Sequence, residues 1–377
     1  MKVVHIMEDY RPTVSGAMVR NSSMLEAYKK RFKQDDVYVV NLEGKKYVGK
    51  EVINEITVYR EKNIFRQLLR AIRLVNRENA DVIQGHNYRF LLIAYLASKL
   101  SRRHPKVYVE MHALYHTSSW KAWMGRRLLR KVSGVFVLAE CAKKYLLDVY
   151  EMDGDKISVI RNGMSSELQE DLKSICPNDE INRWIQDQKQ MGRKIIFYSG
   201  AFIEWQGVNF LAKNIERINN EVQNISILMI GDGPEFENVS KLAEKQKNVL
   251  IHKGIDRGEI NIFMDLVDVV IVPREKNLST DTAVPLKLIE AMQKGKCIVA
   301  SGDNGIRELL NDSNGLLYSP NIIEELISKI QQAMSRDDLR ITLGKKAQDD
   351  VDEILTSWDT NSVVVHDAYL KGMRRDG

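Results

Sequence analysis

The amino-acid sequence predicts an α/β protein with two doubly wound domains, each a parallel sheet covered by helices on both faces. The length of 377 residues suits two domains of ordinary size. Short apolar runs alternate with helix-length amphipathic stretches almost throughout, which is the pattern of repeated β–α units with right-handed crossovers. A polar stretch from about Met164 to Arg193 contains Pro177 and no strand pattern, and it separates the two series.

The strands are expected at short apolar runs, several of them continuous, as in sheets that are buried on both faces. The first half has such runs at Val3–Met7, Val37–Asn41, Ile56–Arg60, Val82–Gln84, Val107–Glu110, Val135–Ala139 and Ile157–Ile160. The second half has them at Ile195–Ser199, Ile225–Ile230, Val249–His252, Val269–Val272, Ile298–Ala300 and Leu316–Tyr318. Helices are predicted at Ala17–Lys30, Ile64–Glu78, Leu91–Leu100, Asn209–Asn219 and Trp358–Met373.

These patterns place the first domain at residues 1–175 and the second at residues 190–355. Residues 356–377 are expected to form a C-terminal helix that crosses back to the first domain. Ligands of doubly wound sheets bind outside the carboxyl ends of the strands. If those edges of the two sheets face each other, the ligand lies in a cleft between the domains.

Composition and charge narrow the class of protein. Residues 1–150 carry 28 lysines and arginines against 14 acidic residues, whereas the remainder carries 28 against 37. The basic half indicates either an anionic partner or solvated helix faces, and no nucleic-acid recognition motif accompanies it. The three cysteines are Cys141, Cys176 and Cys297, whose spacing suits neither a disulfide framework nor a zinc site. With no signal peptide and no apolar run of about 18 residues, we expect a cytoplasmic protein.

The most informative segment is Val284–Gly305, which follows a predicted strand and begins a helix near Pro285. Proline suits the first turn of a helix. The free amides of Leu286 and Lys287 would favour an anion such as a diphosphate, and the lysine adds a full positive charge. Glu290, one turn later, could accept two hydrogen bonds from a ribose diol. The residues alone leave open a generic βαβ unit in which Glu290 is a solvated helix residue.

This segment, P-x-K-x-x-E-A-M-x-x-G-K before an apolar strand, resembles the donor-site signature of retaining GT-B glycosyltransferases, in particular glycosyltransferase family 4. Other segments resemble motifs of that family in the same order. They are Asp81–His86, Val107–Leu114, Val159–Met164, Phe197–Leu211, Ile227–Glu235, Val267–Glu275 and Gly315–Pro320. The resemblance implies the GT-B fold, an acceptor-binding first domain and a donor-binding second domain.

The resemblance also implies roles for single residues. Glu290 would bind the ribose and Lys287 the diphosphate, and His112 would lie beside the transferred sugar; these three are the expected catalytic residues. His112 could instead be a histidine lining the core at a strand end, and a role for His86 stays open. The expected donor-binding residues are Gly16, Gly200, Gln206, Gly231, Arg274, Thr282, Leu286, Lys287 and Glu290. The turn Val14–Ser15–Gly16 would let the backbone approach the donor closely.

Three positions depart from the family pattern. Ala201 and Gln206 stand where the family usually has the Arg and Lys that contact the diphosphate. Lys287, Arg274 or Arg307 would then supply the missing charge. Thr282 stands where the family often has the first Glu of an E-x7-E pair, and its hydroxyl could still bond a sugar hydroxyl.

The implied reaction needs no resident cofactor or metal. The transition state is oxocarbenium-like with a diphosphate leaving group, which a helix N-terminus and Lys287 can stabilise. A UDP-sugar is the expected donor, with retention of anomeric configuration. The D-x-D spacing of Asp153–Gly154–Asp155 lies in a polar stretch and is interpreted as a turn, not a metal site.

A basic stretch with aromatic residues is the candidate acceptor or membrane surface. It contains Trp120, Trp123, Arg126, Arg127 and Arg130. As a helix it could lie on an anionic membrane surface, on the inner face of the membrane, and meet a glycan or a lipid-linked acceptor. Alternatively its tryptophans and leucines face the core and its arginines face water.

Two other functions stay open at this point. The chain could be a non-catalytic GT-B partner of another transferase, since Ala201 and Gln206 remove two phosphate contacts. It could also be a GT-B nucleotide-sugar epimerase, which would act without an acceptor. A Rossmann dehydrogenase is disfavoured, because no G-x-G-x-x-G follows Val3–Met7.

Overall fold

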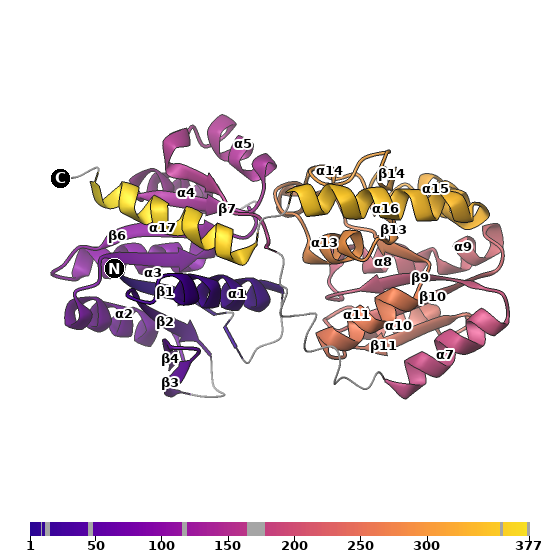
Figure 1. The fold of residues 1–377 in the computed structure, drawn as a ribbon, viewed down its shortest axis with the longest axis horizontal. Coiled ribbons are helices and arrows are strands. Elements are labelled where there is room, and N and C mark those ends of the chain that lie inside the picture. The colour runs from indigo at the N-terminus through magenta and orange to yellow at the C-terminus, as the bar shows by residue number, and fades with distance from the viewer. Residues whose placement is uncertain are drawn as a thin grey trace. The chain divides into compact units, whose positions relative to one another are not determined.

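The computed structural model describes residues 1–8, 10–11, 16–43, 48–114, 119–163, 178–354 and 357–374. The chain forms two compact units: Met1–Ser165 with Leu355–Gly377, and Ser166–Ile354. Each unit has one sheet with helices packed on it (Figure 1). The expected boundary stretch lies largely outside the described residues, but its end forms helix α7 (Asp179–Gln190). Asn178 caps this helix, and its residues Ile181 and Ile185 are buried.

The first unit contains an eight-stranded sheet in the order β3-β4-β2-β1-β5-β6-β7-β8. Its strands are β1 (Lys2–Met7), β2 (Asp36–Leu42), β3 (Gly49–Ile53), β4 (Ile56–Glu61), β5 (Val82–His86), β6 (Lys106–Met111), β7 (Gly134–Val137) and β8 (Ile157–Val159). The sequence pattern missed β3, which pairs antiparallel with β4 at the sheet edge. It alternates partly buried with exposed residues, and Val52 is 64% exposed, so no apolar run marks it.

Six helices cover this sheet among the described residues. They are α1 (Gly16–Arg31), α2 (Ile64–Glu78), α3 (Asn87–Leu100), α4 (Ser119–Lys131), α5 (Glu140–Asp148) and α17 (Trp358–Arg374). The last of them, α17, comes from the far end of the chain and runs alongside α1 (Figure 1). Trp358, Val365 and Tyr369 of α17 are buried in the core of the first unit, so the C-terminal helix is part of that core.

The second unit contains a six-stranded parallel sheet in the order β11-β10-β9-β12-β13-β14. Its strands are β9 (Lys194–Ser199), β10 (Ile225–Gly231), β11 (Val249–Lys253), β12 (Val269–Val272), β13 (Cys297–Ser301) and β14 (Leu316–Tyr318). Its helices after α7 are α8 (Val208–Lys213), α9 (Ile215–Glu221), α10 (Phe236–Ala243), α11 (Arg257–Leu266), α12 (Leu278–Asp281), α13 (Leu286–Gln293), α14 (Asn304–Arg307), α15 (Ile323–Ser335) and α16 (Asp337–Ile354). The single helix expected at Asn209–Asn219 is therefore two, joined at Asn214.

No helix in the described part of the chain is both long and apolar enough to cross a membrane. Strands β9, β10, β12 and β13 are buried almost along their whole length, which is why their sequences are continuous apolar runs. Because all their pairings are parallel, the carboxyl ends of these strands meet at one edge. The candidate donor residues follow that edge.

Candidate active site

The carboxyl edge of the second sheet brings together several of the predicted donor residues of the second unit. Gly200 directly follows β9, Gly231 ends β10, and Arg274 lies just after β12. Leu286 and Lys287 open α13, whose N-cap is Pro285. Amides in the first turn of a helix have no acceptor inside it, and the helix dipole makes that end positive. This edge therefore has the groups that a diphosphate needs.

The Lys287 ammonium is a buried cation. Its Nζ is buried and has no hydrogen-bond partner in the part of the chain that the structure describes. The Nζ lies 4.2 Å from the centroid of the Tyr198 ring. It also lies 2.7 Å from where a Cβ on Gly200 would be, so a side chain there would collide with it. Burial lowers the pKa of Lys287 to about 7, with Arg274 acting in the same direction and Glu290 against it.

Arg274 is 2% exposed and holds the loop that leads into α13. It donates from Nη1 to the Ala283 carbonyl at 2.9 Å, and the same atom lies 3.6 Å from Asp303 Oδ1. Burial raises the pKa of Asp303 to about 6, although Arg274 opposes the rise. Arg307, the other expected substitute cation, donates to the Gly302 carbonyl at 2.9 Å. In this structure both arginines contact protein groups that shape the loops around the donor edge.

Glu290 forms an ion pair with Arg257, the first residue of α11. Both side chains are largely buried, at 17% and 25% exposure. A ribose approaching Glu290 would therefore meet the guanidinium as well. Arg257 could not be predicted from the sequence, because it follows a polar turn and belongs to no recognisable motif.

The other predicted donor residues take up different environments. Gln206 is 8% exposed, and its Oε1 is buried without a partner among the described residues. Thr282 is 3% exposed and donates its hydroxyl to the Leu278 carbonyl at 2.6 Å. A Cβ on Gly231 would lie 1.9 Å from the Gly200 carbonyl oxygen, so the two glycines allow a close backbone approach. Gly16 is the exposed first residue of α1, and the rest of its expected turn lies outside the described residues.

The carboxyl edge of the first sheet holds a buried ionic cluster around Glu110. Glu110 is the last residue but one of β6, and its side chain is 2% exposed. Its Oε1 accepts from Arg20 Nε at 2.6 Å and lies 3.0 Å from His112 Nε2. Burial would raise the pKa of Glu110, but Arg20 and His112 hold it well below its usual range. An ionised Glu110 places the His112 proton on Nε2, which leaves Nδ1 as an acceptor in the neutral ring.

His86 lies behind this cluster at the end of β5. Its Nε2 lies 3.2 Å from His5 Nδ1, and its Nδ1 is buried with no partner among the described residues. Gln84 contacts both His86 and Glu110 and accepts from the Tyr369 hydroxyl on α17. Burial lowers the pKa of His86 well below its usual range, so its ring is neutral at physiological pH. His86 and His112 lie close together, with ring centroids 5.8 Å apart.

The ligand atoms of His86, Glu110 and His112 lie within 4.8 Å of one another, close enough to share a cation. Arg20 Nε also pairs with Glu110 Oε1 at 2.6 Å, so a guanidinium already balances the charge of this carboxylate. The D-x-D segment leads into the short helical turn Gly154–Lys156. Asp153 caps this turn, because its Oδ1 accepts from the amide of Asp155 at 3.0 Å.

Helix α4 carries the predicted acceptor or membrane residues. Trp123 is 57% exposed, and Arg127 lies 4.3 Å from the centroid of its ring. Arg126 lies over Tyr150, and Arg130 pairs with Glu151 at 2.9 Å. The Trp120 side chain lies outside the described part of the structure. At Trp123, therefore, the tryptophan faces outward beside the arginines, not into the core.

Comparison with known proteins agrees with the architecture. The model of glycosyl transferases group 1 matches residues 180–350, and that of glycosyltransferase family 4 matches residues 26–168. An uncharacterised glycosyltransferase of Methanocaldococcus jannaschii is 24% identical over 55% of this chain and 57% of its own length. The lipopolysaccharide 1,2-N-acetylglucosaminetransferase of Salmonella typhimurium is 24% identical over 51% of each chain. The chain spans about half the length of the curated relatives it matches.

Among solved structures, Anabaena HepE in complex with UDP-glucose is 15% identical, with a TM-score of 0.75. The match covers 98% of this chain and 100% of that one, which is a likeness of fold. Two doubly wound units of this kind define a GT-B protein. One family model matches each unit, so the second unit is a domain of the glycosyl transferases group 1 kind and the first unit is a domain of the glycosyltransferase family 4 kind.

Proposed function

We propose that this glycosyltransferase moves a hexose or N-acetylhexosamine from a UDP-sugar to a glycan or lipid-linked acceptor, with retention of anomeric configuration. The observation that carries the proposal is Lys287 at the start of α13, a buried ammonium for which the described residues supply no hydrogen-bond acceptor. A buried cation without a partner is costly unless a ligand supplies the counter-charge. A donor diphosphate is an anion of suitable charge.

The proposed chemistry uses groups that each unit orients within itself. As the bond between sugar and diphosphate breaks, negative charge grows on the leaving group, and Lys287 with the α13 amides stabilises it. Glu290 and Arg257 face the nucleoside, where the carboxylate accepts from the ribose hydroxyls. His112, held through Nε2 by Glu110, offers Nδ1 to a hydroxyl of the transferred sugar. The acceptor hydroxyl attacks the anomeric carbon from the face that the diphosphate leaves, and its proton passes to the departing phosphate oxygen. The diphosphate therefore balances the positive charge on the sugar, and no nucleophilic carboxylate is needed.

A thermal-shift screen against UDP-, GDP-, ADP- and TDP-sugars tests the donor site. We expect UDP-sugars to stabilise the protein and Glu290→Ala to abolish that shift, because the ribose contact is lost. Glu324→Ala is the matched control, since it removes a carboxylate that pairs with Arg217 on the surface of the same unit. An unchanged shift in Glu290→Ala would mean that the nucleotide binds elsewhere.

The affinity for UDP-glucose is expected to fall as the pH rises above about 7. Below its pKa of about 7, Lys287 carries the proton that attracts the diphosphate, and above it the free protein must first take up a proton. The limiting loss is about tenfold for each pH unit. Calorimetry from about pH 6 to about pH 9 measures this loss. A pH profile that is the same in Lys287→Met and in the wild type would rule the explanation out.

Ala201 and Gln206 favour one other candidate, a non-catalytic partner of a second transferase. They replace the two cations that the family usually places on the diphosphate. Turnover of UDP-sugar by the purified chain separates the two functions. A catalyst releases UDP with multiple turnovers, whereas a partner subunit binds the nucleotide without releasing product.

A further inference from the structure

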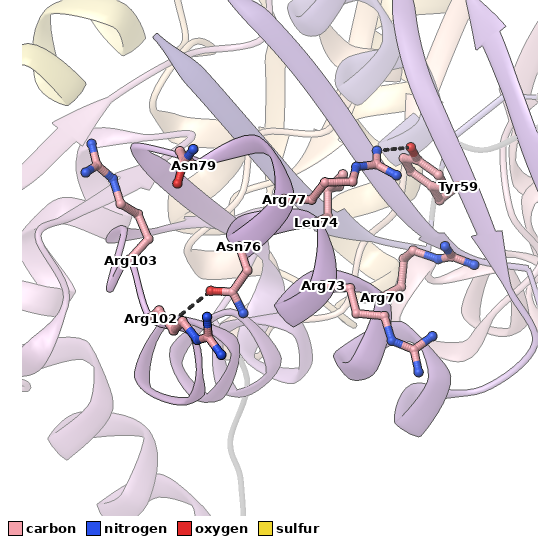
Figure 2. Close-up of a pocket in the computed structure, with 9 residues that line it drawn as sticks. All are labelled: Tyr59, Arg70, Arg73, Leu74, Asn76, Arg77, Asn79, Arg102 and Arg103. Carbon is pink, nitrogen blue, oxygen red and sulfur yellow. Dashed lines mark hydrogen bonds between the residues drawn. The ribbon is translucent and has the colours of Figure 1, made fainter.

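A pocket of about 760 Å³ lies at the amino edge of the first sheet. Its walls are the second half of α2 and the loop between α3 and β6, with Tyr59 of β4 contributing from the sheet (Figure 2). The segments that follow α2 and α3 lead into the amino ends of β5 and β6. Glu110 and His112 lie at the opposite ends of these parallel strands, so the pocket is separate from the proposed sugar site.

Five arginines line this pocket. Three of them, Arg70, Arg73 and Arg77, recur at helical spacing along α2, which places them on one face of the helix. Arg102 and Arg103 come from the loop after α3. Figure 2 shows these side chains around the hollow. A concentration of guanidinium groups in one concave site is electrostatically unfavourable unless anions neutralise it.

Tyr59 anchors one wall. It is 4% exposed, and the guanidinium of Arg70 lies 5.1 Å from the centroid of its ring. Arg70 Nε also lies 2.8 Å from Glu61 Oε1. Arg77 donates from Nη2 to the Tyr59 hydroxyl at 2.9 Å. These contacts hold two guanidinium groups in place before any ligand arrives.

The described part of the chain does not supply a carboxylate partner for every arginine of the pocket. Arg77 also pairs with Glu78 at 2.6 Å, and Arg103 lies 3.6 Å from Asp81. By contrast, no carboxylate lies within ion-pair distance of Arg73 or Arg102 among the residues that the structure describes, and both are exposed. Among the described residues, three carboxylates lie beside the five guanidinium groups, which leaves the pocket about two positive charges.

We propose that this pocket binds an anion with two or more phosphate groups. The planar fork of arginine matches phosphate oxygens in pairs, and such charge-assisted bonds are the strong ones. Arg73 and Arg102, for which the described structure offers no carboxylate partner, supply the charge, and Arg70 and Arg77, which are fixed around Tyr59, supply the shape. Phosphate of this kind can come from a soluble oligophosphate or from the headgroups of an anionic membrane. The proposal is independent of the donor site in the second unit.

The test compares full-length wild type with Arg73→Gln/Arg102→Gln. Binding of inorganic tripolyphosphate is measured by calorimetry with the donor site saturated by UDP-glucose. Binding to phosphatidylcholine vesicles with and without phosphatidylglycerol is measured by sedimentation. The control, Arg183→Gln/Lys189→Gln, removes the same charge from exposed positions of α7. Arg102→Gln alone changes only a loop residue and serves if the double variant unfolds.

We expect the double variant to bind at least tenfold more weakly than both the wild type and the control. Loss of tripolyphosphate binding identifies a soluble oligophosphate as the source. Loss restricted to phosphatidylglycerol vesicles identifies membrane headgroups. The proposal is overturned if the wild type binds neither probe, or if the pocket variants and the control bind equally.

Discussion

Replacing Arg20 by methionine is expected to lower the stability of the first unit by about 3–5 kcal/mol. Arg20 is 2% exposed, and its Nε donates to the equally buried Glu110. Its other nitrogens donate to the Ile160 carbonyl at 2.9 Å and to Asn162 Oδ1 at 3.0 Å, and it lies over Trp358. Methionine fills similar space but leaves a buried carboxylate without its cation. Hydrogen exchange of the β6 and α17 amides measures the loss in this unit.

A surface pair on the same helix is the control for Arg20. Arg31 lies 3.3 Å from Asp359, and both side chains are more than half exposed. Arg31→Met should therefore change stability by less than about 1 kcal/mol. The double variant Arg20→Met/Glu110→Gln should recover part of the loss, because the uncompensated charge is gone. Equal effects of Arg20→Met and Arg31→Met would show that the buried cluster does not stabilise the fold.

Lys287→Met is expected to weaken UDP-glucose binding by roughly 10- to 100-fold while raising the stability of the second unit by about 1–3 kcal/mol. Binding falls because a charge-assisted bond to the diphosphate is lost. Stability rises because the buried Nζ has no acceptor in the described structure, so that its desolvation is not compensated. Calorimetry measures the first effect and denaturant unfolding the second.

Lys296 provides a matched control in the same unit. Burial also lowers its pKa, but its Nζ donates to the carbonyls of Asp265 at 2.8 Å and Val267 at 3.1 Å. Lys296→Met should therefore lower stability and leave UDP-glucose binding unchanged. If Lys287→Met also lowered stability and bound UDP-glucose normally, Lys287 would be a structural lysine.

Most strands could be predicted because a buried parallel strand needs apolar residues on both faces. Strand β10 is such a case, with every residue from Ile225 to Gly231 buried. Strand β3 was not predicted, because an exposed edge strand needs no apolar run. Helix α7 was missed because its buried residues, Ile181 and Ile185, lie among many polar ones in a stretch assigned to the domain boundary.

Only part of the candidate site could be predicted, because a sequence shows the spacing of residues within one segment and not the contacts between distant segments. Lys287 and Glu290 belong to one contiguous segment, so their proximity follows from helical spacing. Arg20 and Glu110 lie 90 positions apart, and Arg257 and Glu290 lie 33 apart. No local sequence pattern predicts such pairs, because each pair forms only when strands and helices from distant segments pack together.

The sequence by itself determined the two series of β–α units, the helix that begins at Pro285 and the positions of the glycines and histidines at strand ends. Apolar periodicity and turn chemistry are local, so they can be read along the chain. Only the tertiary structure decided that the Lys287 ammonium is buried without an acceptor among the residues described, that Glu110 holds His112, and that five arginines share one pocket. Burial, desolvation and charge pairing depend on which distant segments pack together, and the sequence alone does not show these tertiary contacts.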